Sequence, residues 1–255
     1  MTGAIHVLEQ DLLVYRRVWR GSLLVSFLSP ILFLSAIGLG LGALVNRGSG
    51  GVAGLPYVAF LAPGLLATTA MQTGSIEATY PIMGKVRWDR TYEAMLATPL
   101  SLADLVIGDL AWLALRSLLV SAVFFLVMLV FGLPRGPLSI LAVVAGGLTG
   151  LAFAAPIYAF STQQENDSGF SALQRFVIVP LFLFGGAFFP ITKLPLLLQI
   201  VAWLTPLYHG VALARGLALD RIGLPEALLH FTVLLAYVAA GTALSWLGLR
   251  RRMTG

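Results

Sequence analysis

The chain alternates long apolar runs with short polar intervals, and six of the runs are long enough to cross a bilayer. A transmembrane helix needs about 20 predominantly apolar residues. The pattern therefore predicts an all-α integral membrane protein with six transmembrane helices in a single domain, residues 1–255. We expect the six spans at residues 22–45, 57–80, 106–130, 138–160, 173–189 and 227–249.

The segment before the first span predicts an amphipathic helix that lies in the membrane interface. Ile5, Leu8, Leu12, Tyr15 and Trp19 repeat at intervals of three and four residues, and the charged residues of this segment lie off that stripe. An apolar stripe that ends in an aromatic anchor and basic residues is typical of an interfacial helix. We expect this helix over residues 5–20, with an ordinary cytosolic lead-in as the alternative.

The interval from Lys85 to Asp109 is the longest charged stretch within the apolar part of the chain, with seven charged side chains. Thr91–Ala97 contains good helix formers. Pro99 ends that helix, because proline lacks an N–H and moves the preceding residue out of the α region. Ser101 stands three residues before an aspartate, the spacing of a capping box that restarts a helix. This helix–corner–helix unit is either a docking surface or an amphipathic loop on the lipid headgroups.

Residues 190–217 contain a mostly uncharged run that is long enough for a seventh span but is interrupted by Pro195 and Pro206. The interruptions predict two short helices, roughly Leu196–Leu204 and Leu207–Leu217. Non-helical backbone at membrane depth is tolerated only where protein covers it or where it lines a cavity. We therefore expect a re-entrant or external helix pair between spans five and six.

The distribution of basic residues favours this count of six spans. With six spans, both termini and the charged interval share a side that carries ten Lys and Arg residues, and the other side carries five. A seventh span would change the division to nine against six. The positive-inside rule therefore places both termini in the cytoplasm. The chain shows no clear internal repeat, so the pattern does not support an inverted-repeat secondary transporter.

The composition supports a membrane protein and limits its chemistry. Hydrophobic residues make up 58% of the chain and charged residues 11%, against about 25% charged residues in a typical soluble domain. The chain has no cysteine, and its formal charge of +5 reflects topology rather than nucleic-acid binding. It contains no G-x-x-x-x-G-K-[ST], H-E-x-x-H or G-x-S-x-G motif. We therefore expect no catalytic residues, metal or cofactor on this chain.

Three ionisable residues, Glu77, Asp109 and Arg116, lie within or at the edge of the predicted spans. Charged groups in a bilayer are costly and usually find partners. Spans two and three run antiparallel, so Glu77 and Arg116 should lie at similar depth in the cytoplasmic half. They either pair or line a vestibule, or each one reaches the interface separately.

Two motifs in this chain resemble the permease subunits of type-2 ABC exporters. The first is the R-x-x-E-x-x-L-x-T-P-L-S pattern of Arg90–Ser101. The second is the F-x-G-x-F-F-P pattern of Phe184–Pro190, followed by Leu194-Pro195 and the P-L-x-H of Pro206–His209. The resemblance covers nearly the whole chain. It is closest to the branch that exports lipo-oligosaccharide nodulation factors and daunorubicin-like drugs.

The resemblance implies that Arg90–Ser101, here named the coupling segment, is a coupling helix seated on a separate ABC ATPase subunit. ATP and Mg²⁺ would bind to that ATPase. Two permeases, identical or homologous, would pair in the bacterial inner membrane and move a lipid, glycolipid or hydrophobic drug outward. The alternatives are a secondary transporter or channel without an ATPase partner, and an intramembrane enzyme.

The resemblance also assigns residues to the two motifs. Those expected to couple the chain to the ATPase are Arg90, Tyr92, Glu93, Met95, Leu96, Pro99 and Leu100. Those expected to form the re-entrant motif are Gly186, Phe188, Phe189, Pro190, Pro195, Pro206 and His209.

Overall fold

The computed structural model describes residues 2–254, and this part of the chain is almost entirely helical. The elements are α1 (Thr2–Phe33), the π-helix η1 (Leu34–Leu41), α2 (Gly42–Ser49), α3 (Tyr57–Glu77), α4 (Tyr80–Met83), the π-helix η2 (Gly84–Trp88), α5 (Thr91–Leu96), α6 (Leu102–Val130), the 3-10 helix η3 (Pro137–Ile140), α7 (Leu141–Gln163), α8 (Ser168–Leu173), the π-helix η4 (Gln174–Ile178), α9 (Val179–Phe184), the 3-10 helix η5 (Ile191–Lys193), α10 (Leu196–Trp203), α11 (Pro206–Ala218) and α12 (Leu224–Thr254).

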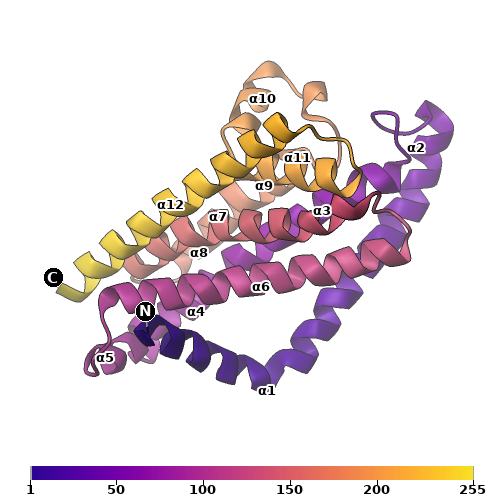
Figure 1. The fold of residues 1–255 in the computed structure, drawn as a ribbon. Helices are drawn as coiled ribbons and strands as arrows, with labels where there is room; N and C mark the ends of the chain where they lie inside the picture. The colour runs from indigo at the N-terminus through magenta and orange to yellow at the C-terminus, as the bar shows by residue number, and fades with distance from the viewer. Residues whose placement is uncertain (1, 255) are drawn as a thin grey trace.

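Helix α7 lies at the centre of the bundle and packs against α3, α6, α11 and α12. Gly74 of α3 and Gly150 of α7 allow two of these helices to approach closely, because a Cβ atom on Gly74 would lie 2.4 Å from the carbonyl oxygen of Gly150. Figure 1 shows both termini and α5 toward one end of the bundle, with α2 and α10 toward the other. The charged interval therefore lies at the same end as the termini.

Four helical runs are long and apolar enough to cross a membrane, or five if the bent pair α10–α11 counts as one span. The four runs are Ser26–Gly48, Leu102–Val130, Pro137–Gln163 and Leu224–Met253. Helix α3 has 21 residues but is less apolar, and most of its side chains are buried among neighbouring helices. The apolar helix Ser168–Phe184 is shorter. The chain is an all-helical, multi-pass membrane protein, and the count of six spans stays a prediction.

The first part of the chain differs from the expected interface helix followed by a separate span. Helix α1 continues without a break from Thr2 to Phe33 and bends along its length (Figure 1). Gly21 separates the two expected elements and Ser22 begins the second, and Ser26 donates a hydrogen bond to the backbone oxygen of Ser22 at 2.8 Å. Glycine–serine pairs and such side-chain bonds are known causes of helix bending.

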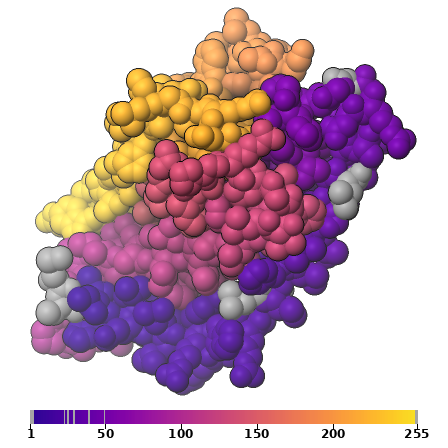
Figure 2. Space-filling view, turned by 45° about the vertical axis from the view of Figure 1, so that its right-hand side comes forward, coloured from indigo at the N-terminus to yellow at the C-terminus, as the bar shows by residue number. Residues whose placement is uncertain are grey.

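The amphipathic stripe of α1 is only partly exposed, because Leu8 is half-buried and Tyr15 packs against Trp112 of α6. Ile5, Leu12 and Trp19 are exposed, whereas Val7 and Asp11 are buried. Val7 packs against α6 so closely that a Cβ atom on Gly108 would lie 2.5 Å from the Val7 Cβ. Figure 2 shows the indigo and purple start of the chain along the lower and right edge of the molecule. An apolar stripe on this edge is available to lipid.

The fifth apolar helix also differs from the expected span at residues 173–189. It begins earlier, at Ser168, and ends at Phe184. Gly185 and Gly186 follow, and Gly186 has a φ of +86°, a left-handed conformation that glycine adopts without steric cost. Helices α10 and α11 then lie where the proline pattern predicts two short helices, and their axes bend by 81°.

Candidate functional site

The coupling segment consists of helix α5, a corner and the first residues before α6. Ser101 caps α6: its Oγ accepts a hydrogen bond from the Asp104 N–H at 3.2 Å, and the Asp104 carboxylate accepts one from the Ser101 N–H at 3.0 Å. The capping box predicted from the sequence is therefore present. It stiffens the corner around Pro99, because two of the backbone donors at the start of the second helix are satisfied.

The coupling segment has an inner and an outer face. Tyr92 is fully buried, and its neighbours on the inner face, Met95, Leu96 and Leu100, are partly buried against the hydrophobic core. On the outer face, the side chains of Arg90 and Glu93 are 74% and 56% exposed and 3.8 Å apart. Pro99 is exposed as well. Tyr92 was expected among the coupling residues; its position is on the inner face, so it anchors the segment instead of offering a surface to a partner.

A buried polar network connects the coupling segment to four other helical elements. The Tyr92 hydroxyl hydrogen-bonds to the Asp109 carboxylate of α6 and lies 2.9 Å from the Tyr158 hydroxyl of α7. Tyr158 also donates to Asp109 at 3.1 Å. The Lys85 ammonium of η2 lies 2.6 Å from Asp109 and 2.7 Å from Asp11 of α1. The five side chains therefore join α1, η2, α5, α6 and α7 at one end of the bundle.

The protonation states in this network follow from burial and charge. Burial raises the pKa of Asp11 to about 6, although the positive charge of Lys85 acts in the opposite direction. Burial alone would lower the pKa of Lys85, but Asp109 and Asp11 outweigh it and raise that pKa. Burial and the Asp109 carboxylate raise the pKa of Tyr92 well above its usual value. Tyr92 therefore stays protonated and acts as the donor to Asp109.

The second polar cluster contains the two charged residues that were expected at equal depth. Arg116 Nε and Nη2 donate to Glu77 Oε1 at 3.0 and 2.8 Å, and Nη2 donates to Ser22 Oγ at 3.2 Å. The guanidinium carbon lies 4.6 Å from the ring centre of Tyr15 and 5.9 Å from that of Trp112. Of the alternatives left open by the sequence, the structure shows the pair, and it adds α1 as a third element.

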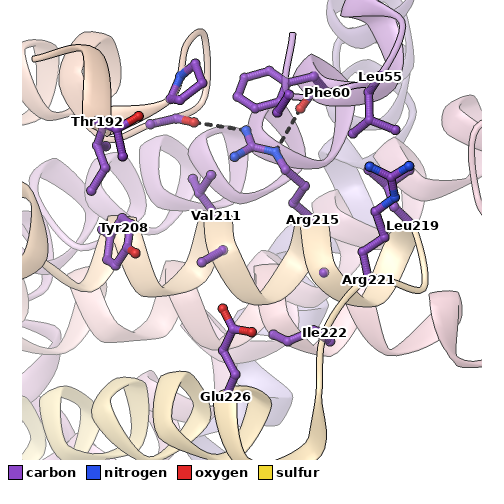
Figure 3. A pocket seen from close by; sticks show the side chains of 16 residues that line it. Leu55, Phe60, Thr192, Tyr208, Val211, Arg215, Leu219, Arg221, Ile222 and Glu226 are labelled. Atoms are coloured by element: carbon purple, nitrogen blue, oxygen red, sulfur yellow. Dashed lines mark hydrogen bonds between the residues drawn. The ribbon is translucent and has the colours of Figure 1, made fainter.

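The chain segment after α9 is held by one arginine of α11. Arg215 Nη2 donates to the carbonyl oxygens of Gly186 and Ala187 at 2.9 and 3.2 Å, and Nε donates to the carbonyl oxygen of Phe60 at 3.0 Å. Its guanidinium carbon also lies 3.8 Å from the ring centre of Phe60. Figure 3 shows the guanidinium between these groups. Arg215 thereby satisfies the carbonyl groups of Gly186 and Ala187, which follow the end of α9 outside any helix.

Arg215 also lines a cavity of about 310 Å³, here named the outer pocket. Tyr208 and Val211 come from α11, and Glu226 comes from the first turn of α12 (Figure 3). Arg221 lies in the connection between these two helices. The outer pocket therefore combines apolar walls with two basic groups and one acidic group.

The remaining residues of the re-entrant motif have different positions, and only Gly186 and Pro190 of the motif line the outer pocket. Phe188 packs against Phe182 and Phe33, and its carbonyl oxygen accepts a hydrogen bond from Tyr57 at 3.3 Å. Pro190 lines the pocket, and Phe189 beside it is partly buried. Pro195 and Pro206 stand at the first turns of α10 and α11. His209 Nδ1 lies 2.9 Å from His230 Nδ1 of α12.

Four residues of these clusters were not expected from the sequence: Asp11, Lys85, Tyr158 and Arg215. Lys85 and Asp11 are 74 residues apart along the chain, so no local spacing connects them. Tyr158 lies in an apolar run where a tyrosine resembles an ordinary core residue. Within residues 2–254, no group of three or more His, Cys, Asp or Glu side chains could hold a metal ion.

Comparison with known proteins identifies membrane transport proteins as relatives over most of the chain. Residues 4–219 match the family model of the ABC-2 type transporter. The chain is similar to nodulation protein J of Sinorhizobium fredii, with 34% identity over 98% of this chain and 93% of the relative. Nodulation protein J of Bradyrhizobium diazoefficiens is 34% identical over 97% and 92% of the two chains. The inner membrane transport permease YadH of Escherichia coli is 21% identical over 91% and 88%.

Proposed function

The chain belongs to the ABC-2 type transporter family, and from this premise we propose that it is the permease subunit of an ATP-driven exporter. It moves a lipid, glycolipid or hydrophobic drug outward across the bacterial inner membrane, with both termini in the cytoplasm. ATP and Mg²⁺ bind to a separate ABC ATPase, since this chain has no phosphate-binding loop. The chain itself is a transport permease and not an enzyme.

The coupling segment carries this proposal. Its outer face exposes the opposite charges of Arg90 and Glu93, which suit a docking contact with a soluble subunit. Its inner face is bonded through Tyr92 to α6 and α7. Only the short corner at residues 97–101 separates α5 from α6. A displacement of the outer face is therefore transmitted to the long helix α6 across a short connection.

A second permease, identical or homologous, completes the transport path in this proposal. The apolar runs Ser26–Gly48 and Leu224–Met253 are only 25% and 17% buried within the chain. Their free faces are wide enough to contact lipid, a partner permease, or both. By comparison, more than half of the residues in the most apolar stretches of Leu102–Val130 and Pro137–Gln163 are buried, so these helices belong to the interior of the bundle.

The class of transported molecule follows from the branch resemblance and is supported by the outer pocket. Its apolar walls and the charged groups of Arg215, Arg221 and Glu226 suit a molecule with an apolar body and a polar end. Nothing in the described residues 2–254 gathers ionisable groups into a chain across the bundle, so the alternative of an ion-driven secondary transporter gains no support.

The decisive experiment reconstitutes the chain in vesicles with a candidate ABC ATPase subunit, taken first from any ATPase gene found beside its own. We expect the ATPase to co-purify with the chain and to drive ATP-dependent movement of a member of a lipid and drug panel. Vesicles with an ATPase variant that cannot hydrolyse ATP are the control. Transport that proceeds equally with the inactive ATPase, or with an ion gradient alone, would contradict the proposal.

A further inference from the structure

A second cavity, of about 410 Å³, lies between α1, α3 and α6 and is here named the inner cavity. Its polar lining consists of Ser22 and Ser26 of α1, Thr73 and Glu77 of α3, and Arg116 of α6. The inner cavity is separate from the coupling segment and from the outer pocket, with which it shares no lining residue. It therefore needs an explanation of its own.

The charged pair in the inner cavity is incompletely bonded. Arg116 is only 8% exposed, and its Nη1 group is buried without a hydrogen-bond partner in the described part of the chain. Both bonds from Arg116 to Glu77 end on Oε1, and no described side chain donates to Oε2. The Glu77 side chain is 24% exposed. The site thus holds a buried guanidinium donor without a partner beside a carboxylate oxygen that accepts no side-chain hydrogen bond, an unfavourable state for buried charged groups.

The surroundings of the inner cavity are those of a lipid headgroup region. Trp19 and Arg20 directly precede the lining residues of α1, with the Arg20 guanidinium carbon 5.7 Å from the Trp19 ring centre. Such aromatic and basic residues mark the membrane interface. Beyond the cavity, Leu24 and Leu28 of α1 are 67% and 50% exposed. Ile76, which lines the cavity, is 56% exposed. A molecule in the cavity therefore has an apolar surface beside it.

We propose that the inner cavity binds the headgroup of a zwitterionic phospholipid that carries a primary amine, phosphatidylethanolamine. The phosphate accepts hydrogen bonds from the Arg116 guanidinium and from the serine hydroxyls. The ammonium donates to Glu77 Oε2. The acyl chains lie along the exposed apolar side chains of α1. A lipid in this position connects the region of the Gly21–Ser22 pair to α3 and α6.

The charges of the inner cavity distinguish this lipid from other membrane lipids. Arg116 and Glu77 together are neutral, so a headgroup with balanced charges fits better than phosphatidylglycerol, whose net negative charge would face the Glu77 carboxylate. Phosphatidylcholine is also zwitterionic, but its quaternary ammonium has no N–H to donate to Glu77 Oε2. We therefore expect the inner cavity to bind phosphatidylethanolamine more tightly than either of the other two lipids.

The test begins with the full chain, purified and stripped of lipid in detergent. Each of the three lipids is added, and thermal unfolding and native mass spectrometry are recorded. We expect phosphatidylethanolamine to raise the unfolding temperature most and to remain bound with a stoichiometry of one. An equal shift of the unfolding temperature with phosphatidylcholine would contradict the role of the ammonium N–H as a donor to Glu77. A larger shift of the unfolding temperature with phosphatidylglycerol would contradict the preference for a zwitterionic headgroup.

Variants then locate the site. Thr73→Phe fills the inner cavity and should abolish the specific shift while the chain still unfolds cooperatively. Thr242→Phe is the matched control, because Thr242 lies on α12, away from the inner cavity, and its hydroxyl donates to the Val238 carbonyl oxygen of the same helix. If Thr73→Phe does not fold, Ser26→Leu replaces it. A variant with a filled cavity that keeps the full lipid-induced shift in unfolding temperature would overturn the proposal.

The charge of Glu77 is tested separately. Glu77→Gln should abolish the preference for phosphatidylethanolamine over phosphatidylcholine.

Discussion

The hydroxyl of Tyr92 in α5 is hydrogen-bonded to the carboxylate of Asp109 in α6, and both side chains are fully buried. The two residues are 17 positions apart in the chain, on either side of the Pro99 corner. Their contact closes that corner into a rigid unit. A charged acceptor makes such a hydrogen bond stronger than one between neutral groups, so the bond is well placed to transmit movement from the coupling segment to α6.

We expect Tyr92→Phe to separate docking from transport. The variant removes the hydroxyl and leaves Asp109 with one donor fewer, at a cost of about 1–3 kcal/mol in the free energy of unfolding. ATPase co-purification should persist, because the outer face is unchanged, whereas ATP-dependent transport should fall. Tyr80→Phe is the matched control, since Tyr80 is 43% exposed. Unchanged transport in Tyr92→Phe would show that the bond does not transmit force.

The outer face is tested by Glu93→Arg. The substitution reverses an exposed charge next to Arg90 and should weaken ATPase binding about tenfold, which corresponds to about 1.4 kcal/mol. Membrane insertion should be normal. Lys193→Glu, at an exposed position of η5, is the control for charge reversal. Normal ATPase recruitment together with retained export in Glu93→Arg would argue against docking at this segment.

The Glu77–Arg116 pair predicts a double-mutant result. Glu77→Arg or Arg116→Glu alone should destabilise the chain by about 3–5 kcal/mol, because each leaves two like charges in a buried site. The double variant restores opposite charges and should recover part of the loss. Chemical or thermal unfolding in detergent measures the four proteins. A double variant no more stable than the worse single variant would mean that the pair does not interact.

The pKa of Asp11 predicts a difference in pH dependence. The folded-state pKa, about 6, lies above the ordinary value of 3.8, so the folded chain binds this proton more tightly than the unfolded chain. The resulting stabilisation is complete below about pH 4 and is lost as the pH rises through about 6. Asp11→Asn removes this titration. The unfolding temperature of the wild type relative to Asp11→Asn should therefore fall between pH 4 and pH 7, and parallel pH profiles would contradict the assignment.

Single cysteines test the six-span topology in this cysteine-free chain. Leu198→Cys in α10 should react with a membrane-impermeant thiol reagent added from outside, because Leu198 is 40% exposed. Arg252→Cys should react only after the membrane is opened. The same two variants in inverted vesicles provide the control, with the opposite labelling pattern. Labelling of Arg252→Cys from outside intact cells would contradict six spans with both termini in the cytoplasm.

Local chemistry was sufficient for several features of this chain. The lengths of the apolar runs predicted an all-helical membrane protein, and Pro99 with the Ser101 capping box predicted the corner before α6. Pro195 and Pro206 predicted the break between α10 and α11. These features depend on residues a few positions apart, whose helix propensities and backbone hydrogen bonds act within one or two turns. Nothing distant is needed to evaluate them.

The tertiary structure decided which faces are buried and which distant charges meet. The sequence placed Tyr92 on an apolar side of α5 but did not reveal that Asp109 and Tyr158 would surround its hydroxyl. Likewise, Lys85 reaches Asp11 only because α1 folds back along α6. Burial and pairing of this kind depend on the packing of whole helices, which brings together side chains that are 17 to 74 residues apart and carry no mutual signal in the chain.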